Sequence, residues 1–306
     1  MSVVDKRRAK KPFGGITIVF GGDFWQILPV IPKASRAEEI HNRRIKSSLN
    51  SASGSLRSVM IPDQYIIHTS RDPIQKLFEV TYPDFLQNIT SHEYLRSRAI
   101  LTPTNIVVDE INIQVLEKIP GTLFTYISQD SIDDVGDDDN DFRSSFPVEY
   151  LNSINMPCIP KHELKLKVGV VVMLIKNLNQ IMGLCNGTRI IVKSCRKNSI
   201  ECEILCGSHV GTKHIISRIE MIPSDTNWPF EFKCVQFLIQ ICYAMTINKS
   251  QGQSLDMVGL YLPRASFSHG HIYVAIYRVT RPKGLHILID SDLCNIVMHL
   301  NALIDP

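Results

Sequence analysis

The junction between an apolar run of strand length and a polar loop constrains the fold of this chain more than any other part of its sequence. Residues 237–246, FLIQICYAMT, are apolar almost throughout, which predicts a buried strand. The loop that follows, TINKSQG at 246–252, is rich in hydroxyl and amide groups and ends in glycine. In open α/β sheets, ligands bind on such loops at the carboxyl ends of the strands. Thr246 or Ser250 is placed to cap a following helix, whose free N–H groups suit a phosphate.

A second strand and a short helix follow this loop. Residues 257–262, MVGLYL, form another apolar run of strand length, and residues 270–279 predict a short apolar helix. The one cation of that helix, Arg278, lies near its end. Strand, polar loop, helix, strand and helix in this order predict an α/β fold.

An upstream segment repeats the pattern of a strand that runs into a polar turn. Residues 15–20 are rich in β-branched side chains and predict a buried parallel strand. This strand leads into GGDFWQILPV at 21–30, where glycine permits a sharp turn. We therefore expect Asp23 and Gln26 to be exposed at the carboxyl edge of the sheet.

Composition allows several classes of protein and disfavours others. The 306 residues suggest one or two domains, and a hydrophobic content of 44% is ample for a core. A net charge of +3 and a pI near 8.4 permit a nucleic-acid partner without requiring one. No apolar run reaches the length of a membrane span and no signal peptide is visible, so we expect neither a membrane protein nor a secreted one. The eight cysteines form no C-x-x-C pair, which suits reduced thiols inside the cell.

The middle of the chain begins with a segment that has no clear secondary-structure signal, and a strand and a helix are predicted after it. Residues 34–93 lack clear periodicity and predict an altered or poorly ordered join. Residues 99–102 predict a short strand, which Pro103 ends before Thr104 or Asn105 caps a helix. In that helix, apolar side chains recur at helical spacing, at Val108, Ile111, Val115 and Ile119.

Short strands joined by tight turns are predicted between residues 164 and 235. Asn186-Gly187 is a strong hairpin signal, and several such strands together suggest a small β-barrel. The region is locally basic, and a basic β surface can hold nucleic-acid phosphates without reading sequence. The alternative is that these cations are ordinary solvated residues. The candidate DNA-binding residues of this region are Lys176, Arg189 and Lys193.

Two runs of like charge stand outside these elements. The basic cluster at 6–11 is compatible with a nuclear-localisation signal, with an arm that contacts phosphate, or with a solvated chain end. Residues 130–141 contain seven aspartates, which repel one another and predict a solvated loop that lies away from DNA. Their spacing is not that of a calcium loop, so no metal site is predicted there.

Four segments resemble motifs of one enzyme family. AMTINKSQGQSL resembles motif V and FSHGHIYVAIYRV resembles motif VI of the superfamily-1 helicases. GGDFWQILPV is similar to motif III and RAILTPTNIVVDEIN to motif IV. The greatest similarity is to the Pif-type 5′-to-3′ DNA helicases, especially their plant and Helitron-transposon branch. The order and spacing of motifs V and VI make the signal specific.

The resemblance implies RecA-like parallel sheet domains with an inserted small SH3-like β-barrel. Residues 1–33 would be the remnant of the first RecA-like domain, and 34–93 the altered join. The second RecA-like domain would comprise 94–163 and 236–306, and the inserted barrel 164–235.

The resemblance also assigns roles to individual residues. It implies that Gln26 senses the γ-phosphate of ATP and that Arg278 is an arginine finger. Asp23 and the motif V residues would couple nucleotide to single-stranded DNA. ATP and Mg²⁺ are the cofactors of the intact family, and no protein metal site is implied. The motif V residues concerned are Thr246, Lys249, Ser250, Gln251 and Gly252.

The chain also departs from the family pattern. The phosphate-binding loop G-x-x-x-x-G-K-[ST] occurs nowhere in the 306 residues. Tyr277 precedes Arg278 where relatives usually carry serine, and His271 stands where they usually carry glutamine. Two hypotheses follow: an ATP-dependent helicase relative truncated at its N-terminus and inactive alone, or a non-enzymatic single-strand-binding remnant of a Helitron-type transposon helicase. Arg98 and Asn105 are compatible with a place near nucleotide or with a structural role.

Overall fold

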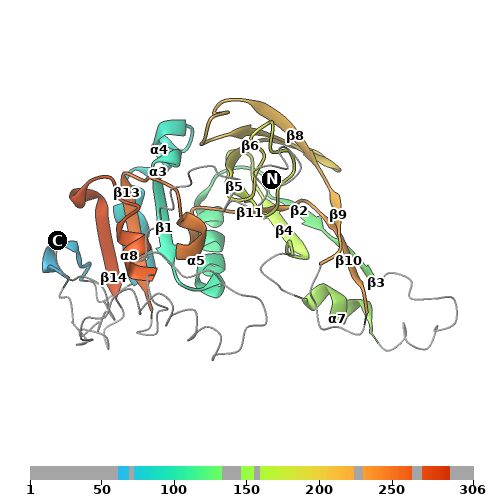
Figure 1. Cartoon of the computed structure of the whole chain (residues 1–306), viewed down its shortest axis with the longest axis horizontal. Helices are drawn as coiled ribbons and strands as arrows, with labels where there is room; N and C mark the ends of the chain where they lie inside the picture. Colours follow the sequence, from blue (N-terminus) through green and yellow to red (C-terminus); the bar gives the residue numbers. More distant parts are fainter. Residues whose placement is uncertain are drawn as a thin grey trace, which may run out of the picture.

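A four-stranded parallel sheet forms the centre of one half of the molecule (Figure 1). The structure is a computed structural model, and it describes residues 61–68, 72–132, 146–154, 159–223, 230–263 and 271–289. The strands lie in the order β12 (Ala244–Thr246), β1 (Arg98–Thr102), β13 (Met257–Leu262) and β14 (Leu285–Ile289). Because the strands are parallel, the polar residues that follow β12 and β1 lie at one edge of the sheet.

Helices cover both faces of the parallel sheet. Successive side chains of β1 point to opposite faces, so each face packs against different helices. Ile100 belongs to the core formed with α2 and α5, whereas Leu101 belongs to the core formed with α8. Gly259 of β13 lies directly beneath α2, where an added Cβ would collide with the Thr81 hydroxyl. The helices are α2 (Pro73–Thr81), α3 (Phe85–Asn88), α4 (His92–Arg96), α5 (Asn105–Lys118) and α8 (His271–Ile276), with 3₁₀ turns η3 (Asp63–Tyr65), η4 (Ile247–Ser250) and η5 (Pro282–Gly284).

Antiparallel sheets form the other half of the molecule, and α5 lies between the two halves (Figure 1). The largest sheet has the order β11 (Ile239–Ile241), β5 (Val171–Leu174), β6 (Arg189–Cys195), β7 (Ser199–Ile204) and β8 (Lys213–Ser217). A second sheet joins β3 (Gln129–Ile132), β10 (Phe232–Gln236) and β9 (Ile219–Met221), and a third joins β2 (Phe124–Ile127) with β4 (Glu163–Leu166). The hairpin predicted at Asn186-Gly187 is present, with φ of +86° at Gly187.

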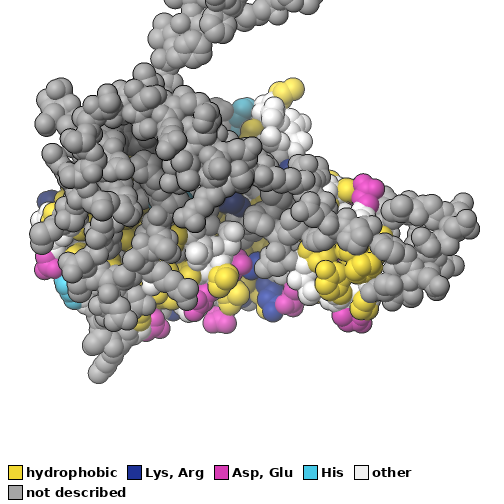
Figure 2. All heavy atoms as spheres, turned by 60° about the horizontal axis from the view of Figure 1, so that its bottom comes forward, with side chains coloured by type: hydrophobic (Ala, Val, Ile, Leu, Met, Phe, Trp, Pro, Cys, Tyr) yellow, Lys and Arg dark blue, Asp and Glu magenta, His cyan; other side chains and the backbone are white. Residues whose placement is uncertain are grey.

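The short helix α7 (Val148–Ser153) packs against β3 at the far end of the antiparallel half. Figure 2 shows hydrophobic side chains gathered on the surface in this area, where Val148 and Tyr150 are exposed. Among the helices of the described residues, none has the length and apolarity needed to cross a bilayer.

The predicted α/β class is confirmed, with one parallel sheet and several antiparallel sheets. The strand pairing crosses the residue boundary that the sequence suggests for the insertion. β2 and β3 precede residue 164, yet they pair with β4 and β10 of the insertion. The predicted strand 237–246 is two strands in different sheets, because β11 pairs with β5 and β12 pairs with β1. The described part of 34–93 contains α2 and α3, so it is more regular than the poorly ordered join expected there.

Several predictions lie outside the described residues. They include the segment 1–33 with Asp23 and Gln26, most of the acidic run, and the chain after 289. Asp130, the first residue of the acidic run, is among the described residues. At this position the prediction of a solvated loop is wrong. It belongs to β3, and its side chain is only 3% exposed.

Candidate functional site

The motif V segment forms a compact turn at the carboxyl edge of the parallel sheet. β12 ends at Thr246, opposite Thr102 of β1, and the chain then enters η4. Ser250 is buried, and its hydroxyl donates to the carbonyl of Ile247 at 2.7 Å, so this side chain closes the turn instead of facing a ligand. Gly252 has φ of +83°, a conformation that glycine adopts without strain.

The remaining predicted residues of motif V lie on the outside of this turn. Thr246 and Lys249 are half-buried, and Gln251 is exposed. η4 packs against β1 and α8. Thr246 therefore lies at the end of β12, and Lys249 lies in the turn that packs against the parallel sheet.

Arg278 joins motif VI to motif V. Its Nε donates to the carbonyl of Val274 at 3.1 Å, and one terminal nitrogen donates to the carbonyl of Gln253 at 3.2 Å. Its own carbonyl accepts from the backbone N–H of Leu255 at 2.8 Å. Arginine carries five N–H donors, so these two side-chain bonds leave donors for an anion. The guanidinium thus lies beside the motif V turn.

The two residues that depart from the family pattern lie before this arginine, one at the start of α8 and one just after its end. Tyr277 is 65% exposed, and its ring stacks on Tyr273 with centroids 5.0 Å apart. His271 begins α8, and burial lowers the pKa of its imidazole. Neither side chain is needed for the two guanidinium bonds described above.

The motif IV segment has the predicted strand and helix. β1 and α5 occupy the expected positions, and Lys118 lies in the last turn of α5. Arg98 lies at the amino end of β1, away from Thr246, and it donates to Ser97 and covers the ring of Tyr94 at 4.2 Å. These contacts favour the structural role of Arg98, whereas Asn105 is exposed at the start of α5.

Sequence reasoning missed Asn112, which lies on the inner face of α5. This amide is buried and makes hydrogen bonds to the backbone between β11 and β12, immediately before motif V. Helical periodicity identifies the apolar side chains of α5 but not the role of a polar one among them. The partners of Asn112 are backbone groups distant in the sequence, which only the folded chain brings close.

The structure corrects the prediction that Arg189 lies on a basic DNA-binding surface. The residue is 1% exposed, and its guanidinium donates to the carbonyls of Leu95 at 2.9 Å and Arg96 at 3.2 Å. These carbonyls end α4, so Arg189 caps a helix of the RecA-like half from within the β insertion. Its charge is used inside the protein.

The other two cations predicted for that surface differ from each other. Lys193 is half-buried and pairs with Glu203 at 3.1 Å, and it also donates to His92 at 3.2 Å. Lys176 is exposed just after β5. The three cations therefore do not form one surface, and only Lys176 keeps the exposure that the prediction requires.

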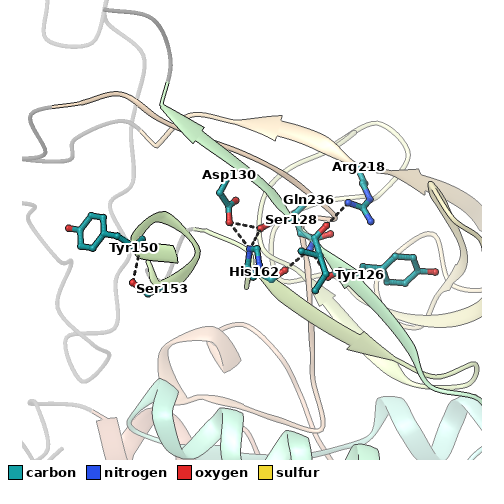
Figure 3. A network of polar contacts seen from close by, with 9 residues as sticks. Tyr126, Ser128, Asp130, Tyr150, Ser153, His162, Arg218 and Gln236 are labelled. Carbon is teal, nitrogen blue, oxygen red and sulfur yellow. Dashed lines mark hydrogen bonds and ion pairs between the residues drawn. The ribbon is translucent and has the colours of Figure 1, made fainter. Parts of the chain in front are cut away.

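A second polar cluster lies in the antiparallel half (Figure 3). The hydroxyl of Ser128 donates to Asp130 at 2.6 Å, and both groups lie 2.8 Å from Nδ1 of His162. In a nucleophilic triad, the hydroxyl and the carboxylate contact opposite nitrogens of the ring. Here they share one nitrogen, so the cluster holds β2, β3 and β4 together and does not activate the hydroxyl.

The part of the chain that the structure describes holds no group of three or more metal-ligating side chains. A pocket of about 630 Å³ opens between α5 and the insertion, with apolar residues such as Leu116 and Ile239 in its wall. Its rim cations are occupied: Lys161 pairs with Asp109, and Lys167 donates to the carbonyl of Ile119. This pocket therefore lacks the free positive charge that a nucleotide phosphate requires.

Comparison with known proteins gives a consistent set of matches. A family model described as "DNA helicase Pif1, 2B domain" matches residues 149–194, and one described as "PIF1-like helicase" matches residues 1–57. The ATP-dependent DNA helicase PIF1 of Rattus norvegicus is 29% identical over 300 residues, which cover 92% of this chain and 42% of the relative. The chain thus spans less than half of the length of that relative.

Solved structures show the same likeness at the level of the fold. The crystal structure of Pif1 helicase from Candida albicans has a TM-score of 0.54 at 21% identity, and it covers 94% of this chain and 68% of its own. The Pif1 helicase from Bacteroides in complex with ADP-AlF3 and ssDNA also has a TM-score of 0.54 at 21% identity, covering 94% of this chain and 65% of its own. These matches show that the chain is similar to Pif1-like helicases in sequence and in fold.

Proposed function

We propose that this chain supplies the part of a Pif-type ATP-dependent DNA helicase that grips single-stranded DNA and presents the arginine finger. The observation that carries the proposal is the contact between Arg278 and the carbonyl of Gln253, which joins motif VI to motif V. The rat relative is by name an ATP-dependent DNA helicase, and the Bacteroides relative was solved with ssDNA. In the intact family, such a helicase acts in DNA repair, recombination or telomere maintenance.

The grip on DNA uses the backbone of the strand and not its bases. Lys249 provides a cation, and Thr246 provides a hydroxyl beside the first turn of α5. The free N–H groups of that first turn and the positive end of the helix dipole favour a phosphate. Binding of this kind is independent of sequence and weakens as salt rises. Arg189 and Lys193 take no part, because their charges are used within the fold.

The residues present fit only one part of an ATP site. Arg278 offers spare donors to a phosphoryl group, as an arginine finger requires. The phosphate-binding loop is absent from the sequence, so the triphosphate has no cradle in this chain. When bound, ATP supplies the energy for translocation through transfer of its γ-phosphoryl group to water, with Mg²⁺. We therefore propose that these 306 residues bind and hydrolyse ATP only together with a phosphate-loop domain.

Fluorescence anisotropy with a labelled oligonucleotide tests the DNA grip. We expect dissociation constants on the order of 10⁻⁴–10⁻⁶ M near physiological salt, with a steep loss of affinity as salt rises. Lys249→Gln should reduce the slope of log affinity against log salt by about 0.7, the value for one phosphate contact on a single strand. Lys118→Gln, at the other end of α5, is the matched control and should leave the slope unchanged. Salt-insensitive or strongly base-specific binding would contradict a backbone grip.

A second candidate is a non-enzymatic single-strand-binding protein descended from a Helitron-type transposon helicase. Phosphate release measured with and without single-stranded DNA separates the two readings once a family phosphate-loop domain is fused ahead of residue 14. DNA-stimulated turnover by the fusion favours the helicase part, and an inert fusion favours the remnant. An in-frame upstream exon that encodes a phosphate loop would also favour the helicase. Nuclear targeting by residues 6–11 is a separate proposal, tested by microscopy of a fluorescent fusion with and without that cluster.

A further inference from the structure

The chain changes sheets immediately before motif V. β11 pairs with β5 in the antiparallel half, and three residues later β12 pairs with β1 in the parallel half. The N–H of Cys242 still bonds to the carbonyl of Val171, while the carbonyl of Tyr243 already accepts from Ile100 at 3.0 Å. Among the strands of the described residues, β12 also lies at the edge of its sheet. The position of motif V therefore depends on what satisfies this crossing.

A single side chain from α5, Asn112, makes hydrogen bonds to the backbone at this crossing. Asn112 Oδ1 accepts from the N–H groups of Tyr243 at 3.0 Å and Ala244 at 2.8 Å. Its Nδ2 donates to the carbonyls of Ile241 and Ala244, each at 3.0 Å. The orientation of the amide is determined by these partners, because two of them are donors and two are acceptors. One carboxamide thus binds the last residue of β11 and the first residue of β12.

The position of Asn112 is itself well defined. Its side chain is only 4% exposed, and Val108, Ile111 and Val115 on the same helix are buried in the core against the parallel sheet. α5 starts at the edge of the sheet where the motif V turn lies, and it packs against β12. A shift of α5 or of the insertion would therefore be transmitted to motif V through this amide.

We infer that Asn112 is a positioning residue for motif V, which sets the place of the DNA-contacting turn and couples it to the β insertion. This inference deepens the proposed function and rests on it. The residue does not touch DNA in this role. It determines where Thr246 and Lys249 lie by bonding to the backbone two residues before Thr246.

Asn112→Asp tests the inference with almost no change of shape. The carboxylate keeps the two acceptor positions for Tyr243 and Ala244, but it has no N–H to donate to the carbonyls of Ile241 and Ala244. We expect hydrogen exchange in peptides covering 241–252 to become about tenfold or more faster, with little change in β6 and β7. Affinity for a labelled single-stranded oligonucleotide should fall in parallel, at a temperature where circular dichroism shows an intact fold. Asn88→Asp, at a half-buried amide of α3 that donates to the carbonyl of Asp84, is the matched control for charge and should change neither measurement.

Asn112→Ser provides a milder variant in case Asn112→Asp does not fold. Its hydroxyl can keep one of the bonds, so its exchange in 241–252 should lie between those of the wild type and Asn112→Asp. Uniformly faster exchange over the whole parallel half, or unchanged exchange in 241–252, would overturn the inference. Unchanged DNA affinity in a variant with faster local exchange would overturn it as well. If the wild-type chain does not bind the oligonucleotide, the proposed function fails, while the exchange pattern still decides the role of Asn112.

Discussion

Replacing Arg189 by methionine separates a structural cation from a DNA-binding one. The side chain lies between the two halves of the molecule, 1% exposed, with its guanidinium bonded to the carbonyls of Leu95 and Arg96. Methionine retains much of the apolar stem of arginine and removes both hydrogen bonds. The two carbonyls at the end of α4 then remain in the interior without this partner.

The expected loss follows from those two bonds. A hydrogen bond to a charged group contributes about 1.5–3 kcal/mol, so Arg189→Met should lower the free energy of unfolding by roughly 3–5 kcal/mol. For a protein of this size, each kcal/mol corresponds to about 2–4 °C, which predicts a fall in melting temperature on the order of 10 °C. Lys176→Met, at an exposed cation, should change the free energy of unfolding by less than about 0.5 kcal/mol.

Urea denaturation followed by circular dichroism measures the stability of both variants, and anisotropy measures their DNA binding. At a temperature where Arg189→Met is folded, its salt slope for a single-stranded oligonucleotide should equal that of the wild type. The reasoning would be refuted by a variant with wild-type stability whose salt slope falls by about 0.7, because that is the signature of a lost phosphate contact. In that case the original expectation for Arg189 would be restored.

Three further predictions concern single residues elsewhere in the parallel half. In the fusion with a phosphate-loop domain, Arg278→Ala should lower DNA-stimulated turnover by about 10³–10⁵-fold with little change in nucleotide affinity, and Arg278→Lys should not restore it fully; an unaffected turnover would make Arg278 a surface cation. Burial lowers the pKa of His286, so the unfolded chain binds the proton more tightly than the folded one. Stability should therefore fall as the pH drops from about 7.5 to about 5.5, and thermal melts of His286→Asn should show a smaller fall; an equal fall in both proteins would contradict this. Gly284→Ala places a methyl group against the backbone carbonyl of Asp256, and it should destabilise the fold by about 1–3 kcal/mol in urea titrations, whereas an unchanged midpoint would show that the two segments can separate freely.

Much of the fold could be predicted because its signals are local. The strand 99–102, the helix after Pro103 and the hairpin at Asn186-Gly187 all appear where propensity and turn chemistry place them. The insertion was harder to delimit. β2 and β3 lie far from residue 164 in the chain, and their membership of the antiparallel half depends on pairing with β4 and β10.

The candidate site divides in the same way. The position of Arg278 near motif V could be anticipated from the motif order, and its bond to the carbonyl of Gln253 places it there. The roles of individual polar residues within the site could not. Ser250 closes its own turn, and Asn112, which no motif singled out, bonds to the crossing before motif V.

The sequence by itself determined much of the secondary structure, the α/β class and the motifs, because these depend on local propensity and on residue types at fixed spacing. Only the tertiary structure decided which polar side chains face solvent and which make hydrogen bonds inside the protein. Arg189 follows a turn in a basic strand region and looks like a surface cation, yet the end of α4 comes to rest on it. The run 237–246 looks like one strand, yet it divides because β5 and β1 each provide a partner for one half. In both cases the deciding partner is distant in the chain, and a buried polar group takes its role from the partner that satisfies it.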